Sequence, residues 1–522
     1  MALTLFPGEL TLAQLRQVVA PTPESIELDW ACRADIRASA ELVRRATEGD
    51  APVYGVNTGF GKLASTRIAR DDLALLQLKL LRSHAVGVGE PLPERVVRLI
   101  LVLKAASLAR GFSGVREEVV DGLIALYNRG VIPVVPAQGS VGASGDLAPL
   151  AHLCLPLIGE GEAFYQGERM PGAQALQRAE LVPLQLGAKE GLALINGTQV
   201  STALALDALL AADRLFEAAV IAGGLTLDAA RGSDGPFDPR IHAVRGQPGQ
   251  IDCAAAYRAL MAGSEIRQSH RDGDDRVQDP YCLRCQPQVM GACLDQMRYA
   301  AQVLVREANA VTDNPLVYAR EGEMISGGNF HAEPVALAAD ALAVVIAEIG
   351  AIAERRVAML IDSVISRLPP FLTPEPGLNS GFMIVHVTAA ALASENKSLA
   401  HPASVDSLPT SANQEDHVSM ATFAARRLQP MLANTAHIVA IELLAAAQGI
   451  EFLRPLKSSP ALEGVLRLVR SVSPAMMADR SLAREIEAVH HLVAAGDIGH
   501  GTEHAIPELL ALTITSPQEK RP

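Results

Sequence analysis

Residues 335–368 read VALAADALAVVIAEIGAIAERRVAMLIDSVISRL, and this stretch decides the class of fold. It contains no proline and no consecutive glycines, so about 34 residues can continue as one helix of roughly 51 Å at ~1.5 Å per residue. Such a helix, rich in Ala, Val, Ile and Leu, needs other helices to cover its apolar surface. The sequence therefore predicts a mainly α protein with a large elongated helical bundle and association between subunits.

The rest of the chain shows the same helical spacing with a few extended interruptions. Within residues 113–130 apolar side chains recur on one helical face, with Ser113 as the expected N-cap and Gly130 as the expected stop. Residues 131–138, VIPVVPAQ, are expected to be extended, because proline and the residue before it resist helix. Strands and helix breaks are expected at a few further places: hairpin-like strands at 163–170 and 316–326, and breaks at 231–239, 272–281, 368–377 and 401–416.

The composition excludes several classes of protein. The 522 residues are 49% hydrophobic, 20% charged and 4% aromatic, which is close to ordinary globular usage and unlike disordered or collagen-like chains. The 45 basic and 58 acidic residues give a net charge of -13, against which a phosphate-binding surface would have to work. We therefore expect no nucleic-acid partner.

Cysteine usage and the N-terminal segment indicate a reduced, cytoplasmic protein. Six cysteines in so long a chain are too sparse for a disulfide scaffold, and residues 1–15 lack a basic region followed by an apolar stretch. The most apolar tracts carry Asp340, Glu348 and Glu442, which interrupt the run of about 18 apolar residues that a membrane span needs. We therefore expect no transmembrane segment and no membrane partner.

Several short motifs suggest common chemistries but lack a required feature. Residues 139–146, GSVGASGD, lack the Lys-Ser/Thr of a phosphate loop, and GVGEPL (87–92) lacks the third glycine of a dinucleotide fingerprint. Cys282 and Cys285 form a C-x-x-C without a second such pair, which favours ordinary thiols over a zinc or redox site. The adjacent His490 and His491 cannot share a helix face as a metal-binding pair would. The sequence therefore predicts no metal site.

The stretch GSVGASGDLAPLAHL (139–153) offers a less common chemistry. The nitrogen of Gly145 has no neighbouring Cβ and can approach the carbonyl carbon of Ala143. Cyclisation there, with loss of water and dehydration of Ser144, would give an imidazolone with an exocyclic methylene, which is an electrophile. Helical sequence resumes with Asp146 as a possible cap, so a helix N-terminus would lie beside the ring. Spacing alone also fits a tight Gly-rich turn, and a serine hydrolase using Ser144 stays a rival.

This segment resembles the prosthetic-group motif of the aromatic amino acid ammonia-lyases, whose Ala-Ser-Gly forms 4-methylidene-imidazol-5-one (MIO). The resemblance implies that Ala143, Ser144 and Gly145 form MIO here and that no external cofactor is needed. It also implies a smaller mixed N-terminal domain over residues 1–205, carrying the electrophile, and a long-helix bundle domain over residues 206–522. Similar stretches run through almost the whole chain: YGVNTGFG (54–61), SHAVGVGEPL (83–92), GLALINGTQ (191–199), QDPYCLRCQPQVMG (278–291), NAVTDNPLV (309–317), SGGNFHAEP (326–334) and NQEDHVSM (413–420).

The resemblance also implies roles for individual side chains. Tyr54 would be the base that removes a β-proton, and Tyr281 would assist proton movement around the amino group. Asn196 would hydrogen-bond the imidazolone oxygen, as an oxyanion donor does. Arg284, together with Gln278, would bind the substrate carboxylate, since a planar guanidinium can make two parallel charged hydrogen bonds.

Substrate choice within the family depends on two places, residues 83–84 and residue 415, beside a packing residue. Phe330 would pack on the ring end of the pocket. His84 follows Ser83 where tyrosine and phenylalanine lyases have His-Leu or Phe-Leu, and an imidazole there can hydrogen-bond a substrate imidazole. Glu415 stands where the phenylalanine enzymes have an amide, and an unpaired carboxylate facing a benzene ring would be costly. These features favour L-histidine as the substrate, converted to trans-urocanate and ammonia.

Resemblance further implies a homotetramer whose active sites draw residues from more than one subunit. His386 and Cys282 depart from the family pattern, a difference that concerns the pocket wall and not the reaction class. The sequence leaves open whether the substrate's amine or its ring would add to the electrophile. A tyrosine or phenylalanine lyase, or a 2,3-aminomutase of the same family, is the nearest alternative, and a catalytically inactive scaffold is a further one.

Overall fold

The chain folds as two compact units, each built from three segments. The computed structural model describes residues 2–49, 52–59, 61, 65–274, 276–502, 506 and 510–512. One unit comprises residues 1–207, 302–340 and 402–426, and the other comprises residues 208–301, 341–401 and 427–522. Three of the five boundaries fall within the long helices α9 (Gln199–Ala229), α14 (Gln286–Ala308) and α15 (Glu333–Ile361). The expected division into continuous domains at residues 1–205 and 206–522 stays a prediction.

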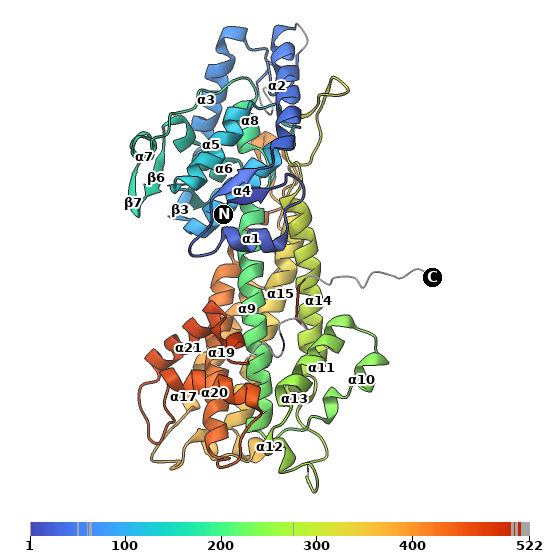
Figure 1. Ribbon diagram of the computed structural model, residues 1–522, viewed down its shortest axis with the longest axis vertical. Helices are drawn as coiled ribbons and strands as arrows, with labels where there is room; N and C mark the ends of the chain where they lie inside the picture. The colour runs from blue at the N-terminus through green and yellow to red at the C-terminus, as the bar shows by residue number, and fades with distance from the viewer. Residues whose placement is uncertain are drawn as a thin grey trace. The chain divides into compact units, whose positions relative to one another are not determined.

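The first unit combines helices with short strands (Figure 1). Strands β1 and β2 pair in parallel, whereas β3–β5, β4–β6–β7 and β8–β9 pair antiparallel. Its strands are β1 (Leu3–Leu5), β2 (Ile26–Leu28), β3 (Val88–Pro91), β4 (Val131–Pro133), β5 (Pro136–Gln138), β6 (Glu162–Tyr165), β7 (Glu168–Pro171), β8 (Leu316–Tyr318) and β9 (Glu323–Ile325). Its helices are α1 (Leu12–Val18), α2 (Arg33–Glu48), α3 (Leu73–His84), α4 (Glu94–Leu108), α5 (Glu117–Asn128), α6 (Leu147–Cys154), α7 (Gly172–Arg178), α8 (Glu190–Ile195) and α18 (Ala421–Arg426).

Helices α3, α6 and α8 pack against one another and position the candidate site. His84 ends α3, residue 147 begins α6, and Asn196 is the C-cap of α8. All three residues therefore stand at helix ends, and all three line the pocket described below.

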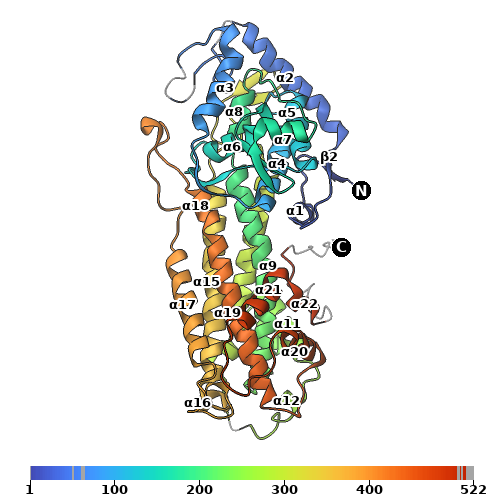
Figure 2. The ribbon, with the colours of Figure 1, turned by 90° about the vertical axis from the view of Figure 1, so that its left-hand side faces the viewer.

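Within the described residues, the second unit is built from helices joined by loops and contains none of the strands β1–β9. Helices α17, α19 and α21 lie side by side (Figure 2). Inside this unit the guanidinium of Arg356 donates to both carboxylate oxygens of Glu442, at 2.5 and 2.8 Å. Its helices, besides parts of α9, α14 and α15, are α10 (Pro239–Ala243), α11 (Pro248–Met261), α12 (Glu265–Gln268), α13 (Tyr281–Arg284), α16 (Ser363–Ser366), α17 (Met383–Leu399), α19 (Leu428–Glu451), α20 (Pro460–Val472), α21 (Ala483–Ala495) and α22 (Asp497–His500).

The mainly α class and the two predicted hairpins are confirmed, and one helix is shorter than expected. The hairpin β6–β7 turns through Gln166 and Gly167, both with positive φ, the backbone that a two-residue hairpin favours. Helix α15 ends at Ile361 and not at residue 368, because Asp362 is extended and its carboxylate accepts from Val364 N and caps α16.

The helix expected over residues 113–130 also starts later than predicted. Arg116 is extended and acts as the N-cap of α5, so Ser113 lies outside the helix. The stop at Gly130 is confirmed, with φ +67. Residues 131–138 are extended as expected, but they form two short strands, β4 and β5, although proline makes this stretch a poor strand by sequence.

Two apolar helices have the length and hydropathy of a membrane span. The described residues include Glu333–Ile361, with a mean hydropathy of 2.2, and Ala421–Glu451, with 1.4. Buried residues make up 67% and 78% of their most apolar windows, as is usual for core helices. The carboxylates in these helices therefore do not lower hydropathy enough to exclude a span by composition, and burial is the better guide.

Candidate active site

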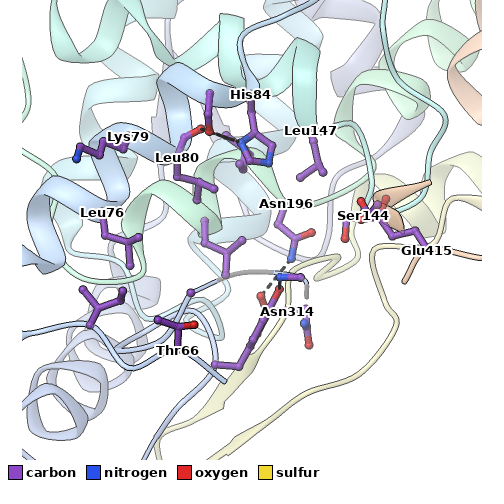
Figure 3. Close-up of a pocket in the computed structure, with 18 residues that line it drawn as sticks. Thr66, Leu76, Lys79, Leu80, His84, Ser144, Leu147, Asn196, Asn314 and Glu415 are labelled. Atoms are coloured by element: carbon purple, nitrogen blue, oxygen red, sulfur yellow. Dashed lines mark hydrogen bonds between the residues drawn. The ribbon is translucent and has the colours of Figure 1, made fainter. Parts of the chain in front are cut away.

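A pocket of about 580 Å³ in the first unit gathers five of the predicted site residues (Figure 3). It is lined by Tyr54, His84, Ser144, Asn196 and Glu415 among other residues. They come from the loop before residue 61, the end of α3, the loop before α6, the end of α8 and the loop before α18. Segments far apart in the sequence thus meet around one cavity.

The loop that carries Ser144 is anchored at both ends. Ahead of it, Met420 N donates to Val141 O (2.9 Å), and the hydroxyl of Ser419 donates to Gly142 O (3.1 Å). Behind it, the buried carboxylate of Asp146 accepts from hydroxyls and a backbone N–H: Ser140 Oγ (2.9 Å), Thr422 Oγ1 (2.5 Å), Ser201 Oγ (2.9 Å) and Ser201 N (2.7 Å). Asp146 occupies the N-cap position of α6 without a capping hydrogen bond, so its side chain fixes the loop and not the helix.

Gly145 has no room for a side chain. Its φ is +70, and an added Cβ would lie 2.1 Å from Gly197 O. Its N–H donates no hydrogen bond to any other residue in the described ranges, whereas the next N–H, of Asp146, donates to Gly197 O (2.8 Å). The local backbone therefore leaves the Gly145 nitrogen available and excludes any larger residue. Ala143, on the other side of Ser144, is buried.

His84 presents an acceptor to the pocket. Its Nδ1 lies 2.8 Å from Leu80 O, and a carbonyl oxygen can only accept, so Nδ1 carries the proton. In the neutral ring Nε2 is then the nitrogen with the lone pair. The ring can accept one N–H from a bound molecule.

Glu415 is held by an unusual turn. Ser411, Ala412 and Asn413 all have positive φ, of 49, 53 and 67, a conformation that non-glycine residues adopt at a cost of about 1–3 kcal/mol each. The turn is closed by Thr410, whose hydroxyl donates to Glu415 Oε2 (2.8 Å) and whose N–H donates to Glu415 O (2.8 Å). This strained segment places a carboxylate in the pocket wall.

Tyr54 lies in the Gly-rich loop at the pocket's edge. The N–H of Gly61 donates to Tyr54 Oη (3.3 Å), so the phenol oxygen acts as an acceptor there. Gly55 has φ +72, and a Cβ at that position would lie 2.4 Å from Leu192 Cδ2. The tight contact fixes the loop against α8. Phe60, in the same motif, lies outside the described residues.

Asn196 lies at the pocket surface with its amide nitrogen already engaged. Nδ2 donates to Asp313 Oδ1 and to Asn314 O, both at 3.2 Å, and buried Oδ1 has no partner within the part of the chain that the structure describes. The amide therefore offers an acceptor, whereas the sequence resemblance implied a donor. That implied donor role requires the amide to break one of these two bonds.

Two buried lysines support Asn196, and sequence reasoning missed both. Lys104 Nζ donates to Asn196 O (2.6 Å), and Lys189 Nζ donates to Asp313 Oδ2 (2.7 Å). Burial lowers the pKa of Lys104 to about 8. Burial alone would raise the pKa of Asp313, but Lys189 and Lys104 hold it below its usual range. A lysine inside the apolar run LILVLKAASLA was the available signal.

Six predicted residues are not part of the pocket lining: Ala143 and Gly145, which flank Ser144, and four residues from elsewhere in the chain. Phe330 is half-buried in the first unit, while Gln278, Tyr281 and Arg284 belong to the second unit. Tyr281 is 71% exposed, and the Arg284 guanidinium lies 4.5 Å from the centroid of its ring. Arg284 Nε donates to the backbone oxygen of Asp279 (2.9 Å). These side chains are displayed at the surface of one chain.

The residues that depart from the family pattern lie in the second unit as well. His386 lies on α17, and its Nε2 is 2.7 Å from Glu354 Oε1. This contact gives the imidazole a carboxylate partner. Cys282 and Cys285 are half-buried free thiols, and burial raises the pKa of Cys282. A raised thiol pKa fits the interpretation of these cysteines as ordinary thiols.

Two groups of side chains among the described residues have the composition of a metal site. They are His331, Glu333 and His417 in the first unit, and His437, Glu487 and His490 in the second. Neither group includes a residue that lines the pocket. Sequence spacing could not find them, because each combines segments that are distant along the chain.

Comparisons with known proteins agree with the fold and identify the family. The sequence profile of the aromatic amino acid lyases matches residues 10–471. The chain therefore belongs to the aromatic amino acid lyase family, and the predictions of this family and of a lyase are confirmed.

Relatives with similar sequence or structure cover nearly the whole chain. The chain is 62% identical, over 95% of its length and 94% of the relative's, to a protein of Aromatoleum aromaticum named histidine ammonia-lyase. It is 61% identical to one of Rhodospirillum rubrum with the same name, covering 95% and 96% of the two chains. The crystal structure of histidine ammonia-lyase from Trypanosoma cruzi is 40% identical with a TM-score of 0.90, covering 99% of each chain. Tyrosine aminomutase from Streptomyces globisporus is 34% identical with a TM-score of 0.91, covering 97% and 99%.

Proposed function

We propose that the protein removes ammonia from L-histidine to give trans-urocanate, using MIO formed from its own residues. The observation that carries this proposal is the pairing of two acceptors, His84 and Glu415, in the pocket that also contains Ser144. An imidazole or imidazolium ring brings N–H donors to such a site, whereas a phenyl ring would cover His84 Nε2 and Glu415 Oε1 without donating a hydrogen bond to either. A site built for hydrogen bonds rejects analogues that lack them.

The residues at 143–145 fit the prosthetic group. Gly145 has an N–H without a partner in the described chain and no space for a Cβ, and the flanking Gly142 and Asp146 are fixed by hydrogen bonds. Ala143, Ser144 and Gly145 would hold MIO. When present, MIO supplies an electrophile that activates an otherwise poor leaving group. No ligand beyond the chain itself is needed for this proposal.

The chain's own side chains would then bind the substrate and move its proton. The Nε2 lone pair of His84 and the carboxylate of Glu415 accept from the substrate ring and set its orientation. As a phenolate, Tyr54 Oη would accept the β-proton, and the Gly61 N–H that donates to it would stabilise the negative charge that this oxygen carries before the transfer. Asn196 is held in place by Lys104 and Asp313 so that its amide faces the reacting atoms.

The substrate carboxylate would be bound by residues from another copy of the chain. Gln278 and Tyr281 are exposed, Arg284 is partly buried at the end of α13, and all three lie outside the lining of the pocket. We propose that neighbouring subunits of a cytoplasmic homotetramer contribute these residues and Phe330 to each active site. Exposed apolar residues on one helix, Met383, Ile384 and Val387 of α17, support association, because such faces are seldom left in water.

The substrate is tested by incubating the purified protein separately with histidine, tyrosine and phenylalanine. We expect ammonia and conjugated-product absorbance with histidine, and preference for tyrosine would overturn the choice of substrate. A β-amino acid product would favour the aminomutase alternative. Glu415→Gln should raise KM for histidine roughly 10–100-fold, while the neighbouring Asp416→Asn, as matched control, leaves it unchanged.

The origin of the electrophile is tested by mass. The peptide that contains residues 143–145 should be lighter by two waters in the active protein, and Ser144→Ala should lose this deficit and nearly all turnover while keeping its fold. Ser471→Ala, at an exposed position of α20, is the control and should keep the deficit. Full activity of Ser144→Ala would refute the role of MIO.

A further inference from the structure

We propose that His331, Glu333 and His417 form a binding site for a divalent transition-metal ion of the zinc type. Each side chain offers one ligand atom, and these atoms lie within 4.8 Å of one another. Two imidazoles and one carboxylate are a common ligand set for zinc and leave a position for water. Donor atoms around a tetrahedral zinc lie roughly 3.4 Å apart, given bonds of about 2.0–2.1 Å. Side-chain rotations that move the ligand atoms by about an ångström would therefore bring them to this spacing.

The tautomer of His331 suits a metal ligand. Its Nε2 lies 3.2 Å from the backbone oxygen of His417, and a carbonyl can only accept, so Nε2 carries the proton. Nδ1 is therefore the nitrogen with the lone pair. A ring N–H that donates to a backbone carbonyl is the usual support for a metal-bound histidine, because it fixes the ring and raises its basicity.

Glu333 supplies a buried oxygen that nothing in the described chain satisfies. The carboxylate belongs to the first residue of α15, and Oε2 is buried without a hydrogen-bond partner among the described residues. Leaving such an oxygen unpaired is costly, and each unsatisfied group of this kind calls for a partner such as an ion. His417, on the third side, is exposed, so an ion can reach the group from solvent.

The second histidine and carboxylate group shows what a poorer site looks like. The rings of His437 and His490 are stacked with centroids 3.8 Å apart and planes at 9°. A metal lies close to the plane of each ring that binds it, so stacked rings cannot share one ion without large rotations. Glu487 Oε2 already lies 3.0 Å from His437 Nε2, and His437 Nδ1 lies 2.8 Å from Ala433 O, so both ring nitrogens are engaged. By contrast, the rings of His331 and His417 are 5.7 Å apart and tilted by 31°.

Metal binding would stiffen one wall of the candidate active site. His417 follows Glu415 by two residues and precedes Met420, whose N–H donates to Val141 O beside the 143–145 loop. His331 directly follows Phe330. An ion that joins these segments should therefore lower KM for the substrate without entering the reaction. This consequence depends on the proposed function, whereas the metal site itself does not.

The test uses the full-length protein, freed of metal with a chelator and titrated with Co²⁺. We expect one Co²⁺ per chain, with visible absorption of a low-symmetry site and with displacement by Zn²⁺. His331→Gln and Glu333→Gln should lower the affinity by roughly 100-fold or more, since even supporting residues account for 10–100-fold. The matched control, His437→Gln, should bind as the wild type does. Circular dichroism verifies that each variant is folded.

Two outcomes would overturn the site: no Co²⁺ bound per chain, or unchanged binding in folded His331→Gln. Loss of binding in His437→Gln would move the site to the second group and would also overturn it. The effect on KM is measured separately with histidine. Co²⁺ binding without lyase activity would refute the proposed function and leave the metal site standing, while activity without Co²⁺ binding would do the reverse.

Discussion

Each of the two units buries a network of charged side chains. Only the network of the first unit reaches the pocket. In the first unit Lys104, Lys189 and Asp313 are joined through Asn196, whose side chain lines the pocket. In the second unit Arg356 and Glu442, both 0% exposed, are joined to each other. One network is open toward a cavity, and the other is closed within a helical core. We infer that the first positions a functional side chain and the second fixes how helices pack.

The chemistry of the cations matches this difference. The planar guanidinium of Arg356 makes two charged hydrogen bonds to Glu442 and a third to Gln286 Oε1 (3.1 Å). Burial alone would lower the pKa of Arg356, but Glu442 raises it above its usual range. Lys104 has a carbonyl and a side-chain amide as acceptors, and burial lowers its pKa. The closed network thus holds its charge more firmly than the open one.

The largest expected effect comes from breaking the closed network on one side. Glu442→Leu leaves a buried guanidinium without its counter-charge and should lower the free energy of unfolding by about 3–5 kcal/mol. Below the new melting temperature KM for histidine should stay within about twofold, because the pair lies outside the pocket lining. Urea denaturation and steady-state kinetics measure the two quantities. Glu321→Gln, in an exposed turn, is the control and should change stability by less than about 0.5 kcal/mol.

A smaller loss of stability, accompanied by a loss of turnover, is expected from Lys189→Met. Asp313 then loses its closest cation, and the free energy of unfolding should fall by about 2–3 kcal/mol, since Lys104 still contributes. Because Asp313 also holds Asn196, kcat should fall roughly 10–100-fold, which distinguishes this variant from Glu442→Leu. Unchanged kcat in the folded variant would show that the open network is structural only.

The sequence predicted the pocket better than it predicted the networks beneath it. Motifs placed His84, Ser144 and Glu415 in one site, because each lies in a short stretch with a family pattern. The partners of Lys104 and Lys189 could not be predicted in this way. Their hydrogen bonds join residues that are 92 and 124 positions apart, and periodicity carries no information about contacts of that range.

Backbone conformation was the other part that the sequence did not reveal. Asp362 ends α15 by capping the next helix, although the apolar pattern continues past it. The turn at Ser411, Ala412 and Asn413 adopts positive φ without a glycine, so local preference is overridden by the packing that positions Glu415. Departures of this kind are expected at functional sites, where local rules and the global fold conflict.

The open network also predicts a pH dependence of stability. The pKa of Lys104 is about 8 in the folded chain, whereas an unfolded lysine titrates near ~10.4. Between these values the unfolded state binds more protons, so stability should rise with pH by up to about 1.4 kcal/mol per unit. The penalty of the buried charge is fully present below pH 8. Urea denaturation from pH 7 to pH 10 should show this slope in the wild type and in the exposed control Lys397→Met, but not in Lys104→Met; equal slopes in all three would contradict it.

The smallest effect is expected when both charges of the closed network are removed together. Arg356→Met with Glu442→Leu leaves no unpaired charge, and apolar replacements of buried pairs are often neutral or stabilising. The hydroxyl of Thr226 and the amide of Gln286 would each lose a partner, at about 1 kcal/mol apiece. The double variant should therefore lie within about 2 kcal/mol of the wild type, and the coupling energy in a double-mutant cycle should exceed about 3 kcal/mol. If the losses of unfolding free energy in the two single variants simply added in the double variant, Arg356 and Glu442 would not be coupled to each other. The network would then not be closed.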